Sequence, residues 1–115
     1  WDADCKSGIQ KTVKNVLHDS WFADVVFEEF PVAGTRLTFD FFNATRNIAV
    51  EVDGNQHYKY NKFFHSNSRQ NFLSQLQRDE KKEYFCEINN ITLLRILESE
   101  IVEGQFPNKT FLNNI

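Results

Sequence analysis

Two short runs of alternating residues, Arg36–Phe42 and Asn47–Asp53, constrain the fold most strongly. Successive side chains of a β-strand point to opposite faces, so an alternation with a period of two predicts a strand. In the first run, Asp40 falls on the face opposite to an apolar set that consists of Leu37, Phe39 and Phe41. In the second run, Glu51 and Asp53 share a face opposite to Ile48, Val50 and Val52. Neighbouring strands would therefore bring three carboxylates together, those of Asp40, Glu51 and Asp53.

Helical spacing and turn residues define the other elements of the first half. Apolar residues at i, i+4, i+7 and i+8 predict a helix over Gly8–Leu17, and Ser7 and Gln10 have the spacing of a capping box. We expect a further strand over Val25–Phe30 and a turn at 31–34, where the chain contains proline and glycine.

The second half predicts a loop, a long helix and a strand. The loop follows Gly54, and helical spacing over Ser68–Asn89 predicts the helix. The apolar run Thr92–Leu97 is typical of a strand covered on both faces, and the tail should form short helical turns. The order αβββαβα indicates a single α/β domain over residues 1–115. Because the chain begins at Trp1, we expect it to be a fragment of a longer protein.

The distribution of charge points to a nucleic acid more than the net charge does. The chain carries −3 overall, but residues 55–82 carry +4 and the remainder −7. A basic segment on an acidic chain is a candidate phosphate-binding surface. A solvated helix face would give the same pattern.

Cysteine usage and hydropathy favour a cytoplasmic protein. Cys5 and Cys86 match no metal-ligand or redox spacing, which favours two reduced thiols. No stretch reaches the roughly 18 apolar residues of a membrane span, and no secretory signal is visible. We expect no membrane partner and a location in the cytoplasm of a bacterial host or a phage-infected cell.

Carboxylates that converge at strand ends are suited to a divalent cation. Mg²⁺ prefers a few hard oxygen ligands and retains several waters, and it can activate water against a phosphodiester. His57, four residues after Asp53, is a candidate general acid or base. A structural alternative stays open, because Asp53-Gly54-Asn55 is a good turn sequence and Glu51 could pair with Arg46 or Lys82.

In this order the residues resemble the PD-(D/E)XK nuclease superfamily, which has a restriction-endonuclease-like αβββαβ core. Asp40 stands in the position of the family's Asp, and Glu51-Val52-Asp53 stands where (D/E)-X-K is expected, with Asp53 in place of the lysine. The closer resemblance, over about Ser7–Leu97, is to very-short-patch-repair-like and EDxHD homing endonucleases. Their histidine and R-D-x-x-K helix correspond to His57 and to Arg78-Asp79-Glu80-Lys81-Lys82.

The resemblance implies a small central mixed sheet flanked by helices, and a site for Mg²⁺, for which Mn²⁺ should substitute. Asp40 would bind the ion directly, and the main-chain carbonyl of Val52 and water would join it, with Glu51 or Asp53 as a further ligand. Proton transfer would fall to His57, with Asp79 orienting that histidine or a metal-bound water.

One departure from the family lies on the first helix. Such families carry a glutamate roughly where Gln10 lies, and a glutamine cannot supply its negative charge. A weakened site, an inactivated variant, and a site that relies on Glu28 or Glu29 instead all stay open.

The leading hypothesis is a metal-dependent DNA endonuclease domain of the phage homing or mismatch-nicking type. The candidate contacts to double-stranded DNA are Lys59, Lys62, Arg69 and Arg78. Target recognition would lie outside this chain or in a homodimer, because phosphate contacts alone do not specify sequence. The alternatives are a non-catalytic nucleic-acid-binding module with the same fold and, more weakly supported, a phosphatase or other metal hydrolase.

Overall fold

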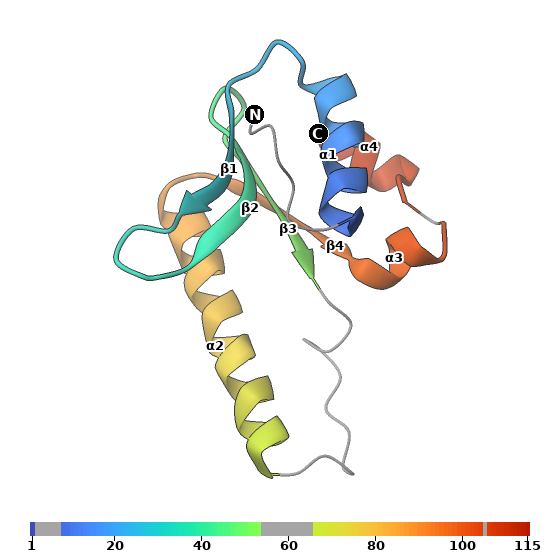
Figure 1. The fold of residues 1–115 in the computed structure, drawn as a ribbon. Coiled ribbons are helices and arrows are strands. Elements are labelled where there is room, and N and C mark those ends of the chain that lie inside the picture. The colour runs from blue at the N-terminus through green and yellow to red at the C-terminus, as the bar shows by residue number, and fades with distance from the viewer. Residues whose placement is uncertain (2–7, 54–65, 105) are drawn as a thin grey trace.

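The computed structural model describes residues 1, 8–53, 66–104 and 106–115. Its elements follow the predicted order, with two short helices at the end (Figure 1). Their bounds are α1 Gly8–Ser20, β1 Val26–Pro31, β2 Thr38–Asn43, β3 Ile48–Asp53, α2 Ser66–Ile88, β4 Thr92–Leu97, α3 Glu98–Val102 and α4 Lys109–Asn114. The predicted helices and strands therefore exist, with boundaries that differ from the prediction by at most three residues.

The four strands form one mixed sheet in the order β1-β2-β3-β4. The first three strands are antiparallel neighbours, and β4 runs parallel to β3 after the chain has passed through α2. The parallel pairing aligns Glu51 with Arg95 and Asp53 with Leu97. The prediction of a mixed α/β fold with a small central sheet is confirmed at this level.

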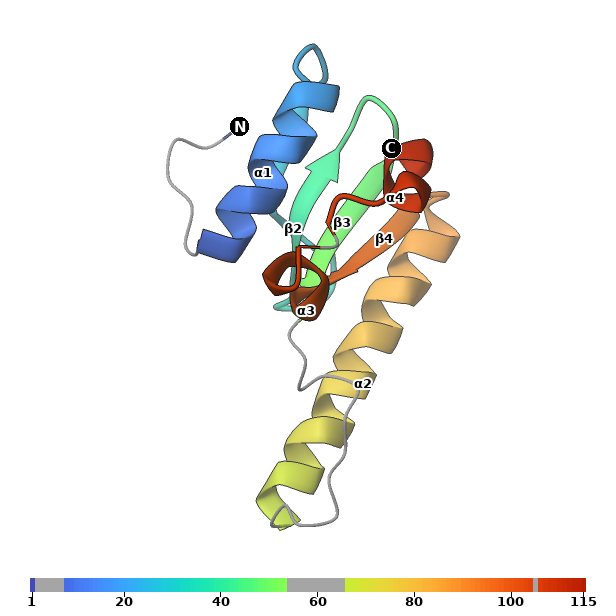
Figure 2. The same ribbon diagram turned by 90° about the vertical axis from the view of Figure 1, so that its right-hand side faces the viewer.

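Helices cover both faces of the sheet. In Figures 1 and 2 the strands lie between α1 on one side and α2 on the other, with α3 and α4 on the side of α1. The first core cluster, on the α1 side, consists of Val13, Leu17, Trp21, Val26, Phe41, Ile48, Val50, Ile96 and Phe111. The second core cluster, on the α2 side, consists of Val32, Phe39, Phe42, Ala49 and Cys86.

The predicted alternation is correct for β3 and wrong for β2. Ile48 and Val50 belong to the first core cluster and Ala49 to the second, as expected. Phe39 and Phe41 were expected on one face, but Phe41 lies in the first cluster, and Phe39 lies in the second, against Phe85 of α2. The pairing of β2 is interrupted at Asp40 on both sides. The pairing with β1 skips Glu29 and Asp40, where Glu29 has a positive φ of 55°, and the pairing with β3 includes only Phe41–Asn43.

The tail folds back on the first core cluster. Asn108 precedes α4, and its side chain accepts a hydrogen bond from the Phe111 N–H at 2.8 Å, which caps the helix. Phe111 is 8% exposed and joins the cluster. Among the described residues, no helix is long and apolar enough to cross a membrane.

The first core cluster should dominate stability. Phe41→Ala removes a side chain that is fully buried and should lower the free energy of unfolding by about 3–5 kcal/mol. Phe22→Ala is the matched control, because Phe22 is 77% exposed, and it should change that free energy by less than about 0.5 kcal/mol. Urea denaturation followed by tryptophan fluorescence measures both, and equal losses would contradict this account of the core.

Candidate active site

Two hydrogen bonds link Asp40 of β2 to Glu51 and Val52 of β3 where the β2–β3 pairing ends. The last paired residues are Phe41 and Val50. Beyond them, the Val52 N–H donates to Oδ2 of Asp40 at 2.8 Å, and the Asp40 N–H donates to Oε1 of Glu51 at 3.1 Å. Side-chain oxygens thus replace main-chain acceptors between the two strands. The predicted proximity of Asp40 and Glu51 is confirmed.

Both carboxyl groups hold their protons more tightly than in water. Burial raises the pKa of Asp40, and the charges of Glu29 and Asp53 add to the rise. Burial and then the charge of Asp40 raise the pKa of Glu51 to about 7, against the opposing effect of Lys82. Desolvation therefore disfavours the charged form of each acid, and for Glu51 the charge of Asp40 adds to this effect.

Helix α2 brings Lys82 to this pair. Cys86, one turn further along α2, is buried in the second core cluster, and Phe85 packs beside it. The same helical face carries Lys82, whose Nζ donates to Oε2 of Glu51 at 2.7 Å, with only 12% of its side chain exposed. Glu51 thus pairs with Lys82, one of the two partners that the structural alternative to a metal site allowed. The alternative partner, Arg46, instead pairs with Asp24 at 2.7 Å.

Arg95 of β4 forms a second centre that the sequence reasoning missed. Its guanidinium lies 3.3 Å from Oδ2 of Asp53 and 3.4 Å from Oδ1 of Asp79, and it also reaches Glu83 at 3.4 Å. Asp53 and Asp79 are 1% and 4% exposed. A signal was available, because Arg95 is the one charged residue in the TLLRIL strand and charge is costly there.

The first helix carries Gln10, the residue that stands in place of the expected glutamate. Gln10 is half-buried on α1, one turn before Lys14, whose Nζ lies 3.1 Å from Glu28. Glu28 and Glu29 were considered as replacements for the missing glutamate. Glu28 forms an ion pair with Lys14. Glu29 lies close enough to act on the pKa of Asp40.

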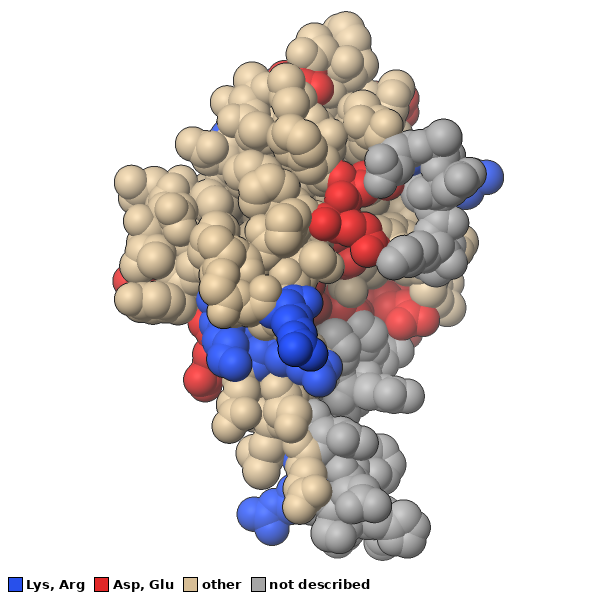
Figure 3. Space-filling view, turned by 60° about the vertical axis from the view of Figure 1, so that its left-hand side comes forward, with Lys and Arg blue, Asp and Glu red and all other residues tan. Residues whose placement is uncertain are grey.

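The remaining predicted residues divide between exposed positions and positions outside the described residues. Arg69 and Arg78 lie exposed on α2. His57, Lys59 and Lys62 fall outside the described residues. Figure 3 shows acidic side chains gathered on one face of the molecule, with a group of Lys and Arg side chains on the same face.

The set of carboxylates that come together is smaller than predicted. Among the described residues there is no group of three or more acidic, His or Cys side chains arranged to hold a metal ion. Asp40 and Glu51 converge, whereas Asp53 is turned to Arg95. Because Mg²⁺ is commonly held by one or two carboxylates and several waters, the pair still fits this ion.

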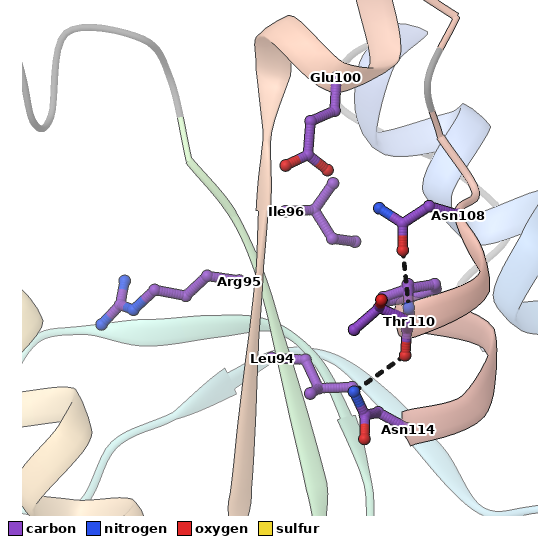
Figure 4. A pocket seen from close by; sticks show the side chains of 8 residues that line it. Leu94, Arg95, Ile96, Glu100, Asn108, Thr110 and Asn114 are labelled. Carbon is purple, nitrogen blue, oxygen red and sulfur yellow. Dashed lines mark hydrogen bonds between the residues drawn. The ribbon is translucent and has the colours of Figure 1, made fainter.

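A groove of about 230 Å³ lies between β4, α3 and α4, away from the carboxylate pair. Figure 4 shows that Glu100 and Asn108 border it, while Arg95 points away from the other labelled side chains. The two sides of β4 therefore have different surroundings, and the charged centre lies on the α2 side.

No family model matches the chain, and no solved structure gives a significant match. It is similar to uncharacterized proteins of three viruses. The similarity to 033L of Invertebrate iridescent virus 3 is 39% identity over 66 residues, or 57% of this chain and 34% of that protein. The chain is 38% identical to 307L of Invertebrate iridescent virus 6 over 60 residues, which are 52% of this chain and 30% of that protein. The chain is 33% identical to 094L of Frog virus 3 over 66 residues, which are 57% of this chain and 43% of that protein. The matched part spans less than half the length of each of these relatives.

The raised pKa of Glu51 should make stability depend on pH. Between its ordinary value of 4.5 and about 7, folded Glu51 keeps a proton that unfolded Glu51 has lost. This residue's contribution to the free energy of unfolding therefore falls as the pH rises from 5 to 7, and levels off above that. Glu51→Gln cannot ionise, so wild type should lose stability relative to this variant between pH 5 and pH 8. Glu87→Gln, at an exposed position of α2, is the control. Its free energy of unfolding, measured by denaturation at each pH, should change with pH as that of wild type does. A constant difference between wild type and Glu51→Gln would contradict the raised pKa.

Arg95 should be essential for stability. Arg95→Met removes the guanidinium from two buried carboxylates and should lower the free energy of unfolding by about 3–5 kcal/mol. Adding Asp53→Asn should restore part of this loss, because it removes one of the two charges. Arg36→Met, at an exposed site, should change stability by less than about 0.5 kcal/mol. Thermal denaturation of five proteins (wild type, Arg95→Met, Asp53→Asn, the double variant and Arg36→Met) measures the effect, and strict additivity of the two site substitutions would refute the pairing.

Proposed function

We propose that this chain is a metal-dependent nuclease domain that hydrolyses phosphodiester bonds of DNA. The observation that carries the proposal is the Asp40–Glu51 pair, a half-buried and a buried carboxyl group with raised pKa values beside the ammonium of Lys82. Carboxyl groups with such perturbed pKa values occur preferentially at functional sites.

The arrangement of elements supports a restriction-endonuclease-like core as the finer description of the fold. The order αβββαβ, the antiparallel β1-β2-β3 pairing and the parallel addition of β4 all agree with it. The acidic pair occupies the point where β2 and β3 stop pairing, and the R-D-x-x-K segment lies on the helix that faces this point.

Each residue of the proposed site would have a separate role in the reaction. Mg²⁺, when bound, would supply charge neutralisation and an activated water. Asp40, Glu51 and the carbonyl of Val52 would hold the ion, and Asp53 is proposed as a more distant acid because Arg95 binds it. The lysine that the strand motif lacks would be replaced by Lys82, which approaches Glu51 from α2. His57 stays the candidate for proton transfer.

Contacts to the DNA backbone would come from α2. Arg69 and Arg78 are exposed on this helix, which extends past the end of the sheet in Figures 1 and 2. Such side chains neutralise phosphates without reading sequence. Recognition of a target would therefore need a homodimer or a further part of a longer protein, and the viral relatives are indeed longer than their matched segments.

A non-catalytic nucleic-acid-binding module is the second candidate. It is favoured by one observation, that the acids already have cationic partners within the chain: Glu51 has Lys82, and Asp53 and Asp79 share Arg95. Such pairs can serve the fold alone. Calorimetry with Mn²⁺ separates the two candidates, because the module alone needs no divalent cation.

The nuclease proposal is tested by Asp40→Asn. The substitution removes a charge but keeps an oxygen to accept from the Val52 N–H, so the fold should persist. The rate of plasmid cleavage in Mg²⁺ or Mn²⁺ should fall at least about 100-fold. Asp19→Asn, at an exposed position of α1, should cleave at the wild-type rate. Undiminished cleavage by Asp40→Asn would exclude this site.

A further inference from the structure

The hydrogen bonds of the carboxylate pair leave few oxygens for another ligand. Oδ2 of Asp40 accepts from the Val52 N–H, and Oε1 of Glu51 accepts from the Asp40 N–H. Oε2 of Glu51 accepts from Lys82. A cation that contacts both acids must therefore bind a Glu51 oxygen that already accepts a hydrogen bond, on a carboxylate that the ammonium of Lys82 also contacts.

Two positive charges cannot share the Glu51 carboxylate at low cost. The ammonium lies 2.7 Å from Oε2 of Glu51, and its charge also acts on Asp40. A divalent cation bound to either oxygen of this carboxylate would lie within a few ångströms of the ammonium, in surroundings that screen charge less than water does. One of the two cations has to move.

Lys82 is the group that can move. The two acids are held by main-chain hydrogen bonds between neighbouring strands, whereas Lys82 reaches Glu51 through a flexible four-carbon chain from α2. Arg95 does not compete for the pair, because its guanidinium lies against Asp53 and Asp79.

We propose that Lys82 is an internal counter-ion of the Asp40–Glu51 pair, and that a divalent cation binds this pair by displacing it. The inference rests on the proposed function, which supplies the cation. Its consequence is regulatory: cation binding frees an ammonium beside the site, where it can contact a phosphate oxygen of the substrate. The lysine is then available for the substrate only when the cation is bound.

Calorimetric titration with Mn²⁺ alone tests the competition. At pH 8, above the pKa of about 7 for Glu51, Lys82→Gln should bind Mn²⁺ about tenfold more tightly than wild type. Lys81→Gln removes the same charge from the neighbouring, exposed position and should bind like wild type. Equal or weaker binding by Lys82→Gln would overturn the inference.

The control Asp40→Asn separates this failure from a failure of the proposed function. If wild type binds Mn²⁺, Asp40→Asn abolishes binding and Lys82→Gln has no effect, the competition alone is wrong. If neither wild type nor Lys82→Gln binds Mn²⁺ at millimolar concentration, both the competition and the metal-dependent nuclease are wrong.

A measurement on the wild-type chain guards against a variant that does not fold. The ammonium signal of Lys82 in a ¹⁵N-lysine NMR spectrum, visible when the hydrogen bond slows its exchange with water, should disappear or shift to that of a solvated lysine at saturating Mg²⁺. The exposed Lys81 should show no such change. A Lys82 signal that stays unchanged at saturating Mg²⁺ would overturn the inference.

Discussion

The burial of acidic groups between the sheet and α2 is the constraint on which this structure depends. Glu51, Asp53 and Asp79 are 5%, 1% and 4% exposed. An isolated buried carboxylate costs several kcal/mol, so each requires a cation or a set of hydrogen-bond donors. Lys82 meets this need from the helix and Arg95 from the adjacent strand.

The same ion pairs fix the position of α2. Among the α2 side chains that the structure describes, Cys86 is the one buried member of the second core cluster, with Phe85 partly buried beside it. Lys82–Glu51 and Arg95–Asp79 add directional contacts one and two turns away along the helix. Because charged pairs require particular partners where apolar contacts do not, they determine which face of α2 meets the sheet. The helix and the acidic pair are therefore one structural unit.

Much of the fold follows from local pattern. The spacing of Val13, Leu17 and their neighbours predicted α1, and the apolar run at Thr92–Leu97 predicted β4 with its correct bounds. The failure of alternation at Phe39 has a specific cause. The pairing of β2 is interrupted at Asp40 on both sides, opposite Glu29 with its positive φ of 55° and beyond the last pair with β3. Phe39 therefore no longer keeps the face that a regular strand would give it.

The sequence by itself determined the element order, the apolar faces of α1 and β3, and the acids that could converge, because these depend on periods of 3.6 and 2 along the chain. Only the tertiary structure decided which acids meet and which cations accompany them. Glu51 and Lys82 are 31 residues apart, and Asp53 and Arg95 are 42 residues apart. Such pairings arise from the parallel register of β3 with β4 and from the rotation of α2 on the sheet. Neither the strand register nor the rotation of the helix produces a periodic pattern in the sequence. For that reason the sequence predicted the proximity of Asp40 and Glu51 but not the role of Arg95.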